Sequence, residues 1–163
     1  WLPLHGGQRL AVAECLLCHN PNGDDSSRRT AAADKVPESI QMARMIHRIH
    51  SGEELTQPYT IYGYGGTPYD FTEVLYPGDR RNCAFCHTSI TTANLPMPTG
   101  TLNVITQKDY FTPQGPGTAA CLGCHDTRDA AAHAYLNTAV FGEACGACHG
   151  ASSEWAVTKV RAR

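Results

Sequence analysis

All eight cysteines of the chain occur in one repeated pattern, in which two cysteines stand three residues apart and a histidine follows directly. This spacing is the attachment signature of c-type haem: two thiols form thioethers with the porphyrin vinyl groups, and the adjacent imidazole binds the iron. We therefore predict four haem c groups. The predicted thioether residues are Cys15, Cys18, Cys83, Cys86, Cys121, Cys124, Cys145 and Cys148, and the predicted proximal ligands are His19, His87, His125 and His149.

Other uses of paired cysteines explain this pattern less well. Two Cys-x-x-Cys pairs can form a structural zinc site, but that site gives no reason for a histidine after every pair. A thioredoxin-like redox pair needs a βαβ context, and a disulfide scaffold does not require the trailing imidazole. Covalent haem accounts for all four copies at once.

Four histidines remain once the proximal ligands are assigned, and four haems need four distal ligands. These residues are His5, His47, His50 and His133. Two neutral imidazoles give a six-coordinate, low-spin, low-potential iron with little room for substrate, which favours electron transfer over catalysis. The alternative is that one or two of these histidines are ordinary surface groups, and His5 is then the first to be absent from an iron.

The pair His47 and His50 lies in a segment with helical character. Asp34 can cap this helix, Pro37 suits its first turn, and Ser51-Gly52 ends it. Met42, Met45, Ile46 and Ile49 form an apolar stripe, and we interpret the methionines as core residues, not as iron ligands. Histidines at i and i+3 share one helix face, so they should bind two different haems. A buried structural pair or half of a zinc site is the alternative.

The composition predicts a fold organised by its cofactors. With 163 residues, 15 glycines and 10 prolines, each haem has only about forty residues of protein around it. We expect a single tetrahaem domain over residues 1–163, mostly irregular, with a few short α-helices wrapped around four closely packed haems and little or no β-structure. Residues 126–137 should be helical, and 102–106 can form a short strand. The tyrosines of segment 59–69 should pack on porphyrin.

Charge and hydropathy limit the partners and the compartment. The formal net charge is −2 and haem propionates make it more negative, so we expect no nucleic-acid partner. Arg28-Arg29 and Arg80-Arg81 are expected to be propionate counter-ions or surface charge. No stretch is apolar enough for a membrane span, and no signal peptide is visible. Because haem is attached after export, we expect an exported protein, with Trp1 either a processed N-terminus or a start within a longer chain.

A longer, ordered set of motifs resembles one pentahaem domain of the outer-membrane decahaem cytochromes of OmcA/MtrC type from metal-reducing bacteria. The motifs are Leu4-His5-Gly6-Gly7, Cys18-His19-Asn20-Pro21-Asn22, Met45-Ile46-His47-Arg48-Ile49-His50-Ser51-Gly52, Tyr62-Gly63-Tyr64-Gly65-Gly66, Leu75-Tyr76-Pro77-Gly78-Asp79 and Cys145-x-x-Cys148-His149-Gly150. The resemblance implies bis-histidine haems in extracellular electron transfer. It also implies distal ligands at His5, His47, His50 and His133.

The chain departs from that family pattern in two places. The family domain has a further Cys-x-x-Cys-His before the His-Gly-Gly element, and it often ends with another histidine where this chain has Val160-Arg161. One haem and one ligand are thus missing together. The resemblance therefore indicates a self-consistent four-haem module.

The leading hypothesis is an electron carrier that is not an enzyme, located outside the cell or on its outer surface, with the periplasm less favoured. Its partners would be other multihaem cytochromes or identical subunits, including a filament of nanowire type in which His5 reaches a neighbour's haem, and its acceptors a mineral, a flavin or an electrode. The alternative is a multihaem reductase for nitrite, hydroxylamine or a sulfur compound, which requires one open iron.

Overall fold

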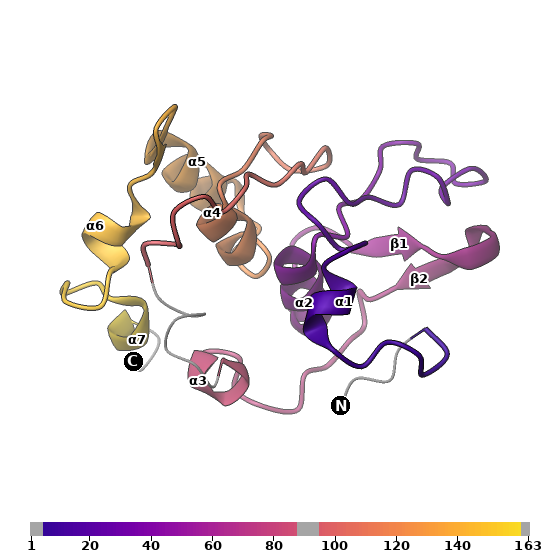
Figure 1. Ribbon diagram of the computed structural model, residues 1–163, viewed down its shortest axis with the longest axis horizontal. Helices are drawn as coiled ribbons and strands as arrows, with labels where there is room; N and C mark the ends of the chain where they lie inside the picture. The colour runs from indigo at the N-terminus through magenta and orange to yellow at the C-terminus, as the bar shows by residue number, and fades with distance from the viewer. Residues whose placement is uncertain (1–4, 88–94, 161–163) are drawn as a thin grey trace.

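The computed structural model describes residues 5–87 and 95–160 (Figure 1). Trp1 and Leu4, at the start of the His-Gly-Gly run, and Arg161, at the end of the chain, lie outside the described residues. Within these ranges, seven short helices and two 3-10 turns are joined by irregular chain and two small hairpins. The helices are α1 Val12–Cys15, α2 Met42–Ser51, α3 Cys83–Cys86, α4 Pro116–Cys121, α5 Arg128–Leu136, α6 Cys145–His149 and α7 Val157–Val160, with 3-10 turns η1 Gly52–Glu54 and η2 Tyr64–Gly66.

Both sheets are antiparallel and two-stranded. Strands β1 (Thr60–Tyr62) and β2 (Pro68–Asp70) pair with Ile61 opposite Tyr69, and strands β3 (Thr138–Ala139) and β4 (Gly142–Glu143) pair with Thr138 opposite Glu143. The expected strand at 102–106 is wrong: only Val104 forms a bridge there, with Gln114. The expectation of few short helices and little β-structure agrees with the fold.

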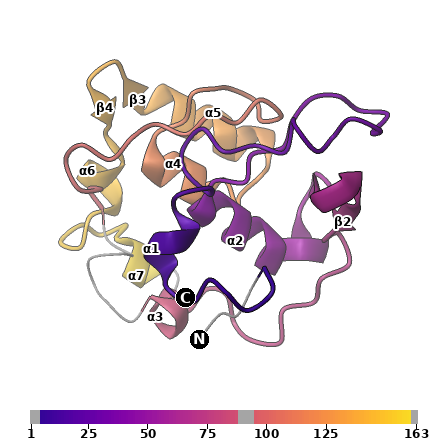
Figure 2. The same ribbon diagram turned by 45° about the vertical axis from the view of Figure 1, so that its right-hand side comes forward.

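Helix α2 lies in the middle of the molecule. The β1–β2 hairpin extends to one side of it and α4 to α7 lie on the other, with α4 packed directly against α2 (Figures 1 and 2). The longest helix described is α2, with ten residues. Within the described ranges, no helix combines the length and apolar character that crossing a membrane requires.

The predicted start of the α2 helix is wrong, whereas its predicted end is confirmed. Asp34 accepts a hydrogen bond from the Val36 amide (2.9 Å) in a local turn, and residues 38–40 instead pair with residues 23–25 in extended conformation. The helix begins after Gln41, whose side chain accepts from the Arg44 amide at 2.9 Å. It ends at Gly52, which has a φ of 41° and lies so close to Val74 that a Cβ would clash with its carbonyl oxygen.

The buried face of α2 is mainly polar, which corrects the predicted apolar stripe. The buried residues of the helix are Arg44, Met45, Arg48 and Ser51. Of the predicted stripe, only Met45 is fully buried, and Ile46 and Ile49 are half-exposed. The apolar edge that the sequence assigns to a protein core is therefore largely available for other contacts.

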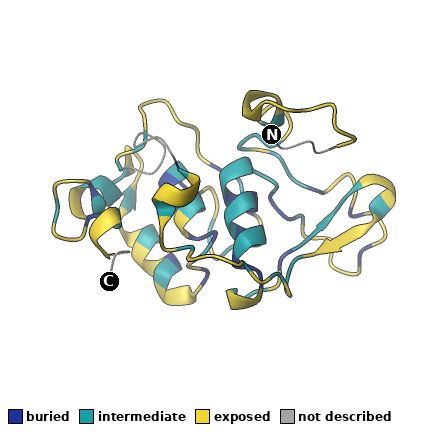
Figure 3. Ribbon diagram, turned by 90° about the horizontal axis from the view of Figure 1, so that it is seen from below, coloured by how far each residue is buried: buried dark blue, intermediate teal, exposed yellow. Residues whose placement is uncertain are grey.

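The protein core itself is small. Eight hydrophobic residues are buried among the described residues: Ala32, Met45, Tyr59, Val104, Ala119, Leu122, Ala131 and Ala156. Figure 3 shows the buried residues of all types scattered over several segments and not gathered in one layer. Tyr59 is fully buried, packs against Phe71 and donates to the Ser39 carbonyl (3.0 Å), so it is a core residue and not the porphyrin contact expected for it.

A buried carboxylate joins the segments before α2 to the β1–β2 hairpin. Asp25, which is 2% exposed, accepts from the Arg29 guanidinium at 2.9 and 2.7 Å, from the Glu38 amide at 2.8 Å and from the Tyr62 amide at 2.9 Å. Arg29 is thus a structural ion-pair partner, which corrects its expected role as a propionate counter-ion. Four hydrogen bonds depend on this one side chain.

We expect Asp25→Ala to destabilise the haem-loaded protein by about 3–5 kcal/mol, because it leaves the buried Arg29 charge and two amide groups unpaired. Denaturant unfolding measures the loss. Asp70→Ala is the matched control, because that exposed carboxylate accepts from neighbouring Thr72 and pairs with no buried charge among the described residues. Equal denaturant concentrations at the unfolding midpoints of the two variants would contradict the expectation.

Candidate haem-binding site

Each Cys-x-x-Cys-His pattern adopts a single helical turn. The histidine amide donates to the carbonyl of the first cysteine at 2.8 Å for His19, 2.8 Å for His87 and 2.9 Å for His125, and the fourth pattern is helix α6 itself. Residues i, i+3 and i+4 share one helix face. Both thiols and the imidazole of each pattern therefore point to the same side, as attachment to one planar group requires.

The cysteines show none of the alternative uses. None of the eight, all of which lie in the described ranges, forms a disulfide. Within residues 5–87 and 95–160, no three or more side chains of the types His, Cys, Asp and Glu are grouped so that they could hold a metal ion. The zinc and disulfide alternatives thus find no support in the described part of the chain.

Three of the four expected distal histidines lie beside the histidine of a Cys-x-x-Cys-His pattern. The ring centroids are 6.1 Å apart for His5 and His19, 6.0 Å for His47 and His87, and 6.1 Å for His133 and His149. A metal-bound imidazole nitrogen lies about 2.0 Å from its ion, so imidazoles on opposite sides of one iron have centroids roughly 6 Å apart.

The angles between the ring planes are also compatible with one shared iron in each pair. They are 29°, 47° and 73° for the three pairs, whereas the centroid separation hardly varies. Two imidazoles on a common iron axis can rotate about that axis without changing their separation. The residues present therefore fit bis-histidine haem.

Backbone carbonyls set the tautomer of two of the histidines that we expect to be proximal ligands. The Nδ1 atom of His19 lies 2.8 Å from the Ile40 carbonyl oxygen, and the Nδ1 atom of His149 lies 2.9 Å from that of Trp155. A carbonyl oxygen only accepts, so each Nδ1 carries the proton. The Nε2 lone pair of each ring is then available for an iron.

The structure does not place His50, the fourth expected distal ligand, in one of these ring pairs. Its ring contacts Tyr76 (centroids 5.3 Å apart), whose hydroxyl lies 3.9 Å from Cys86 Sγ. The third pattern, which ends in His125, lies against the same helix. Ser51 at the end of α2 donates to Cys124 Sγ at 2.9 Å.

A buried ionic network holds α2 in place. Arg44 donates to both carboxylate oxygens of Asp109, at 2.6 and 2.7 Å, and to Glu38 at 3.2 Å. Arg48 lies 3.8 Å from Asp126, which directly follows His125. Burial raises the pKa of Glu38 above its usual value despite the neighbouring guanidinium groups, and burial lowers the pKa of Arg48.

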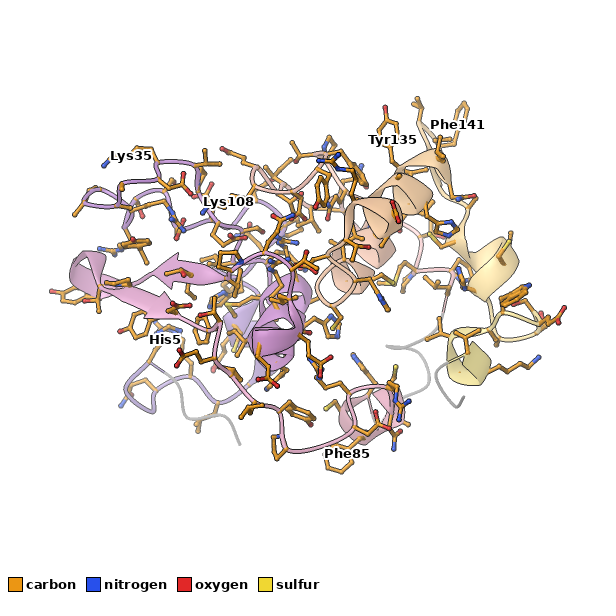
Figure 4. All side chains as sticks on the ribbon, turned by 180° about the vertical axis from the view of Figure 1, so that it is seen from behind. His5, Lys35, Phe85, Lys108, Tyr135 and Phe141 are labelled. Atoms are coloured by element: carbon orange, nitrogen blue, oxygen red, sulfur yellow. The ribbon has the colours of Figure 1, made fainter. Side chains whose placement is uncertain are left out.

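Large apolar side chains lie exposed on and near the patterns. Leu17 and Phe85, in the first and second patterns, are 78% and 73% exposed. Near the fourth pattern, Tyr135 and Phe141 project away from the end of α5 and the β3–β4 turn (Figure 4). These exposed side chains suit contact with a large flat apolar group. The small protein core does not cover them.

In the second arginine pair, Arg80 differs from its expected role and Arg81 does not. Arg80 donates to the carbonyls of His50 (3.2 Å) and Ser51 (3.0 Å) at the end of α2 and pairs with Glu54. It therefore caps the helix that carries two expected ligands. Arg81 forms an exposed pair with Asp79, which agrees with surface charge.

Sequence reasoning missed the residues that support the ligands. Ile40 and Trp155 act through their backbone carbonyls, and residue type does not reveal such a contact. Asp126 could have been noticed as an acidic residue directly after a haem pattern. Its carboxylate accepts from the amides of Thr56 (3.0 Å) and Gln57 (2.9 Å) and so joins the third pattern to the segment after α2.

Comparison with known proteins gives one family and one structure. The family described as "Outer membrane cytochrome MtrC/MtrF-like, domains II/IV" matches residues 2–162. The chain is also similar to a protein solved as "Crystal structure of the outer membrane decaheme cytochrome OmcA", with a TM-score of 0.55 and 26% sequence identity over 99% of this chain. The chain spans 22% of the length of that protein. No curated protein matches the chain.

The contact between the third pattern and α2 yields a prediction. A Cβ on Gly123 would lie 2.7 Å from the Cβ of His47, so Gly123→Val should force α2 and the pattern apart and lower the unfolding free energy by about 1–3 kcal/mol. Denaturant unfolding followed by haem absorbance measures the loss. Ala147→Val is the matched control, because Ala147 is exposed at the same position of the fourth pattern. An equal loss in both variants would argue against this contact.

Proposed function

The chain belongs to the MtrC/MtrF-like family of outer membrane cytochromes, and we propose that it transfers electrons through four covalently bound haem c groups. The observation that carries the proposal is the recurrence of the 6 Å ring separation in three histidine pairs, each with one member in a Cys-x-x-Cys-His pattern. We propose one tetrahaem unit over residues 1–163.

The residues divide into three roles. The eight cysteines hold the porphyrins by thioether bonds, so the cofactors stay in place through many redox cycles. His19, His87, His125 and His149 bind iron from one side, and His5, His47, His50 and His133 bind from the other. When bound, each haem supplies one iron that accepts and releases one electron.

The fourth ligand pair follows by elimination. His50 is the remaining distal histidine and His125 the remaining proximal one, and we propose that they bind the same iron. The 2.9 Å contact between Ser51 and Cys124 supports this, because it holds the end of α2 against the third pattern. His47 and His50 then serve different haems, as the i,i+3 spacing requires.

With both axial positions filled, no iron has room for a substrate, so the chain acts as an electron carrier and not as an enzyme. The reductase alternative needs one open iron. Sequence reasoning named His5 as the histidine to be absent from an iron. However, the ring centroids of His5 and His19 are 6.1 Å apart, close to the separation in the other two pairs. The contact of His50 with Tyr76 makes the His125 iron the one to examine.

Family membership supports a location outside the cell or on its outer surface. The partners we propose are other multihaem cytochromes or identical subunits, and the final acceptor a mineral, a flavin or an electrode. A filament of identical subunits is the extreme form of such an assembly. With 15 acidic and 13 basic residues, the chain offers no general attraction for nucleic acid.

The purified haem-loaded protein should carry a mass increase of four haems and show only low-spin ferric signals in electron paramagnetic resonance. Because both axial positions are filled, the reduced protein should not bind carbon monoxide. Ready carbon monoxide binding by the untreated protein would favour the reductase. His50 contacts Tyr76, so replacement of Tyr76 would free His50 to bind iron. If carbon monoxide binding were then lost, the open site would be the iron of His125.

His133→Ala should convert one haem of four, about a quarter of the iron signal, from low spin to high spin, because that iron loses an axial ligand. The same measurement on His50→Ala should give the same fraction. Tyr135→Ala is the control, since this exposed residue lies on α5 beside His133 and is not an expected ligand. An unchanged spectrum for His133→Ala would remove that residue from the ligand set.

A further inference from the structure

Arg48 carries a buried positive charge between two expected haem ligands. It follows His47 directly in α2 and precedes His50 by two residues, and it is only 2% exposed. Its guanidinium donates to the Gln57 carbonyl at 3.1 Å and lies over the Tyr59 ring, 5.2 Å from the centroid. A guanidinium keeps its charge at every physiological pH.

The charge of Arg48 is less well balanced than that of its neighbour. Arg44 has three hydrogen bonds to carboxylates, at 2.6, 2.7 and 3.2 Å. Among the described residues, Arg48 donates to no carboxylate: Asp126 lies 3.8 Å away and both its oxygens already accept backbone amides, while Glu38 and Asp109 act on Arg48 from farther off. Charges in a protein interior are screened much less than surface charges. A fixed positive charge that is not hydrogen-bonded to a carboxylate therefore lies at the centre of α2.

We propose that Arg48 is a positioning and tuning residue that raises the reduction potentials of the two haems bound by His47 and His50, and that Asp126 opposes it. The inference rests on the ligand assignment proposed above. Reduction adds one electron to each iron and lowers the charge of the haem by one unit. A fixed positive charge nearby stabilises this reduced form, and a fixed negative charge destabilises it.

This charge gives α2 a second role besides carrying ligands. Each of the two haems at its sides would hold an electron more strongly than it would without Arg48.

Redox titration of the haem-loaded protein, followed by haem absorbance, tests the proposal. Arg48→Gln should lower two of the four midpoint potentials and leave the other two unchanged, whereas Arg48→Lys should keep values close to wild type. Asp126→Asn should raise the same two potentials. The double variant Arg48→Gln/Asp126→Asn should return toward wild type, because the two changes oppose each other.

Arg81→Gln is the matched control. Arg81 lies two residues before Cys83, beside the haem that His47 is proposed to bind, but its side chain is 62% exposed and paired with Asp79. Solvent screening should leave all four potentials unchanged in this variant. If Arg48→Gln does not fold, the direction of the shift in Asp126→Asn still decides the sign.

The inference is overturned if Arg48→Gln leaves every potential unchanged or moves all four alike, or if Arg48→Lys behaves like Arg48→Gln. It is also overturned if Asp126→Asn lowers the potentials. Spin state and haem content, measured on the same samples, separate this failure from failure of the proposed function. Low-spin haems in the expected number with unmoved potentials would contradict the role of Arg48 alone.

Discussion

The fold depends on how α2 is anchored. This helix carries His47 and His50, and its buried face is held by ion pairs of Arg44 with Asp109 and Glu38. Arg48 and Ser51 extend the anchoring to the third haem pattern. Buried ion pairs contribute modestly to net stability because desolvation opposes them, but they define one geometry. If its two imidazoles bind two separate irons, as we propose, the helix has more need of a defined position than of a large apolar contact.

The small apolar core follows from the same arrangement. Short helices joined by irregular chain bury few aliphatic side chains, and several large ones, such as Leu17 and Phe85, lie on the haem patterns themselves. A porphyrin offers a large flat apolar surface to such groups. Cofactor binding then contributes directly to folding free energy, as in other small proteins organised by a metal centre. Hydrogen-bonded centres such as Asp25 position the connecting segments around the haem sites.

Much of the candidate site is local in sequence, and this is why it could be predicted. A cysteine pair and the following histidine fall on one helical turn wherever they occur, so the four attachment patterns are independent of distant residues. The end of α2 at Gly52 and the helix over 128–136 are local for the same reason. The start of α2 is not local: residues 38–40 pair with 23–25, and this long-range pairing overrides the capping signal of Asp34 and Pro37.

By itself, the sequence determined the number of attachment patterns, the matching number of remaining histidines and the family resemblance, because each depends only on residue type and spacing. Only the tertiary structure decided which histidines lie together, since His47 and His87 are forty residues apart and meet through folding of the intervening chain. It also decided that Tyr59 and Arg29 belong to the protein interior and that α2 buries arginines. Burial and charge pairing arise from segments far apart in the chain, and helical periodicity does not identify those partners.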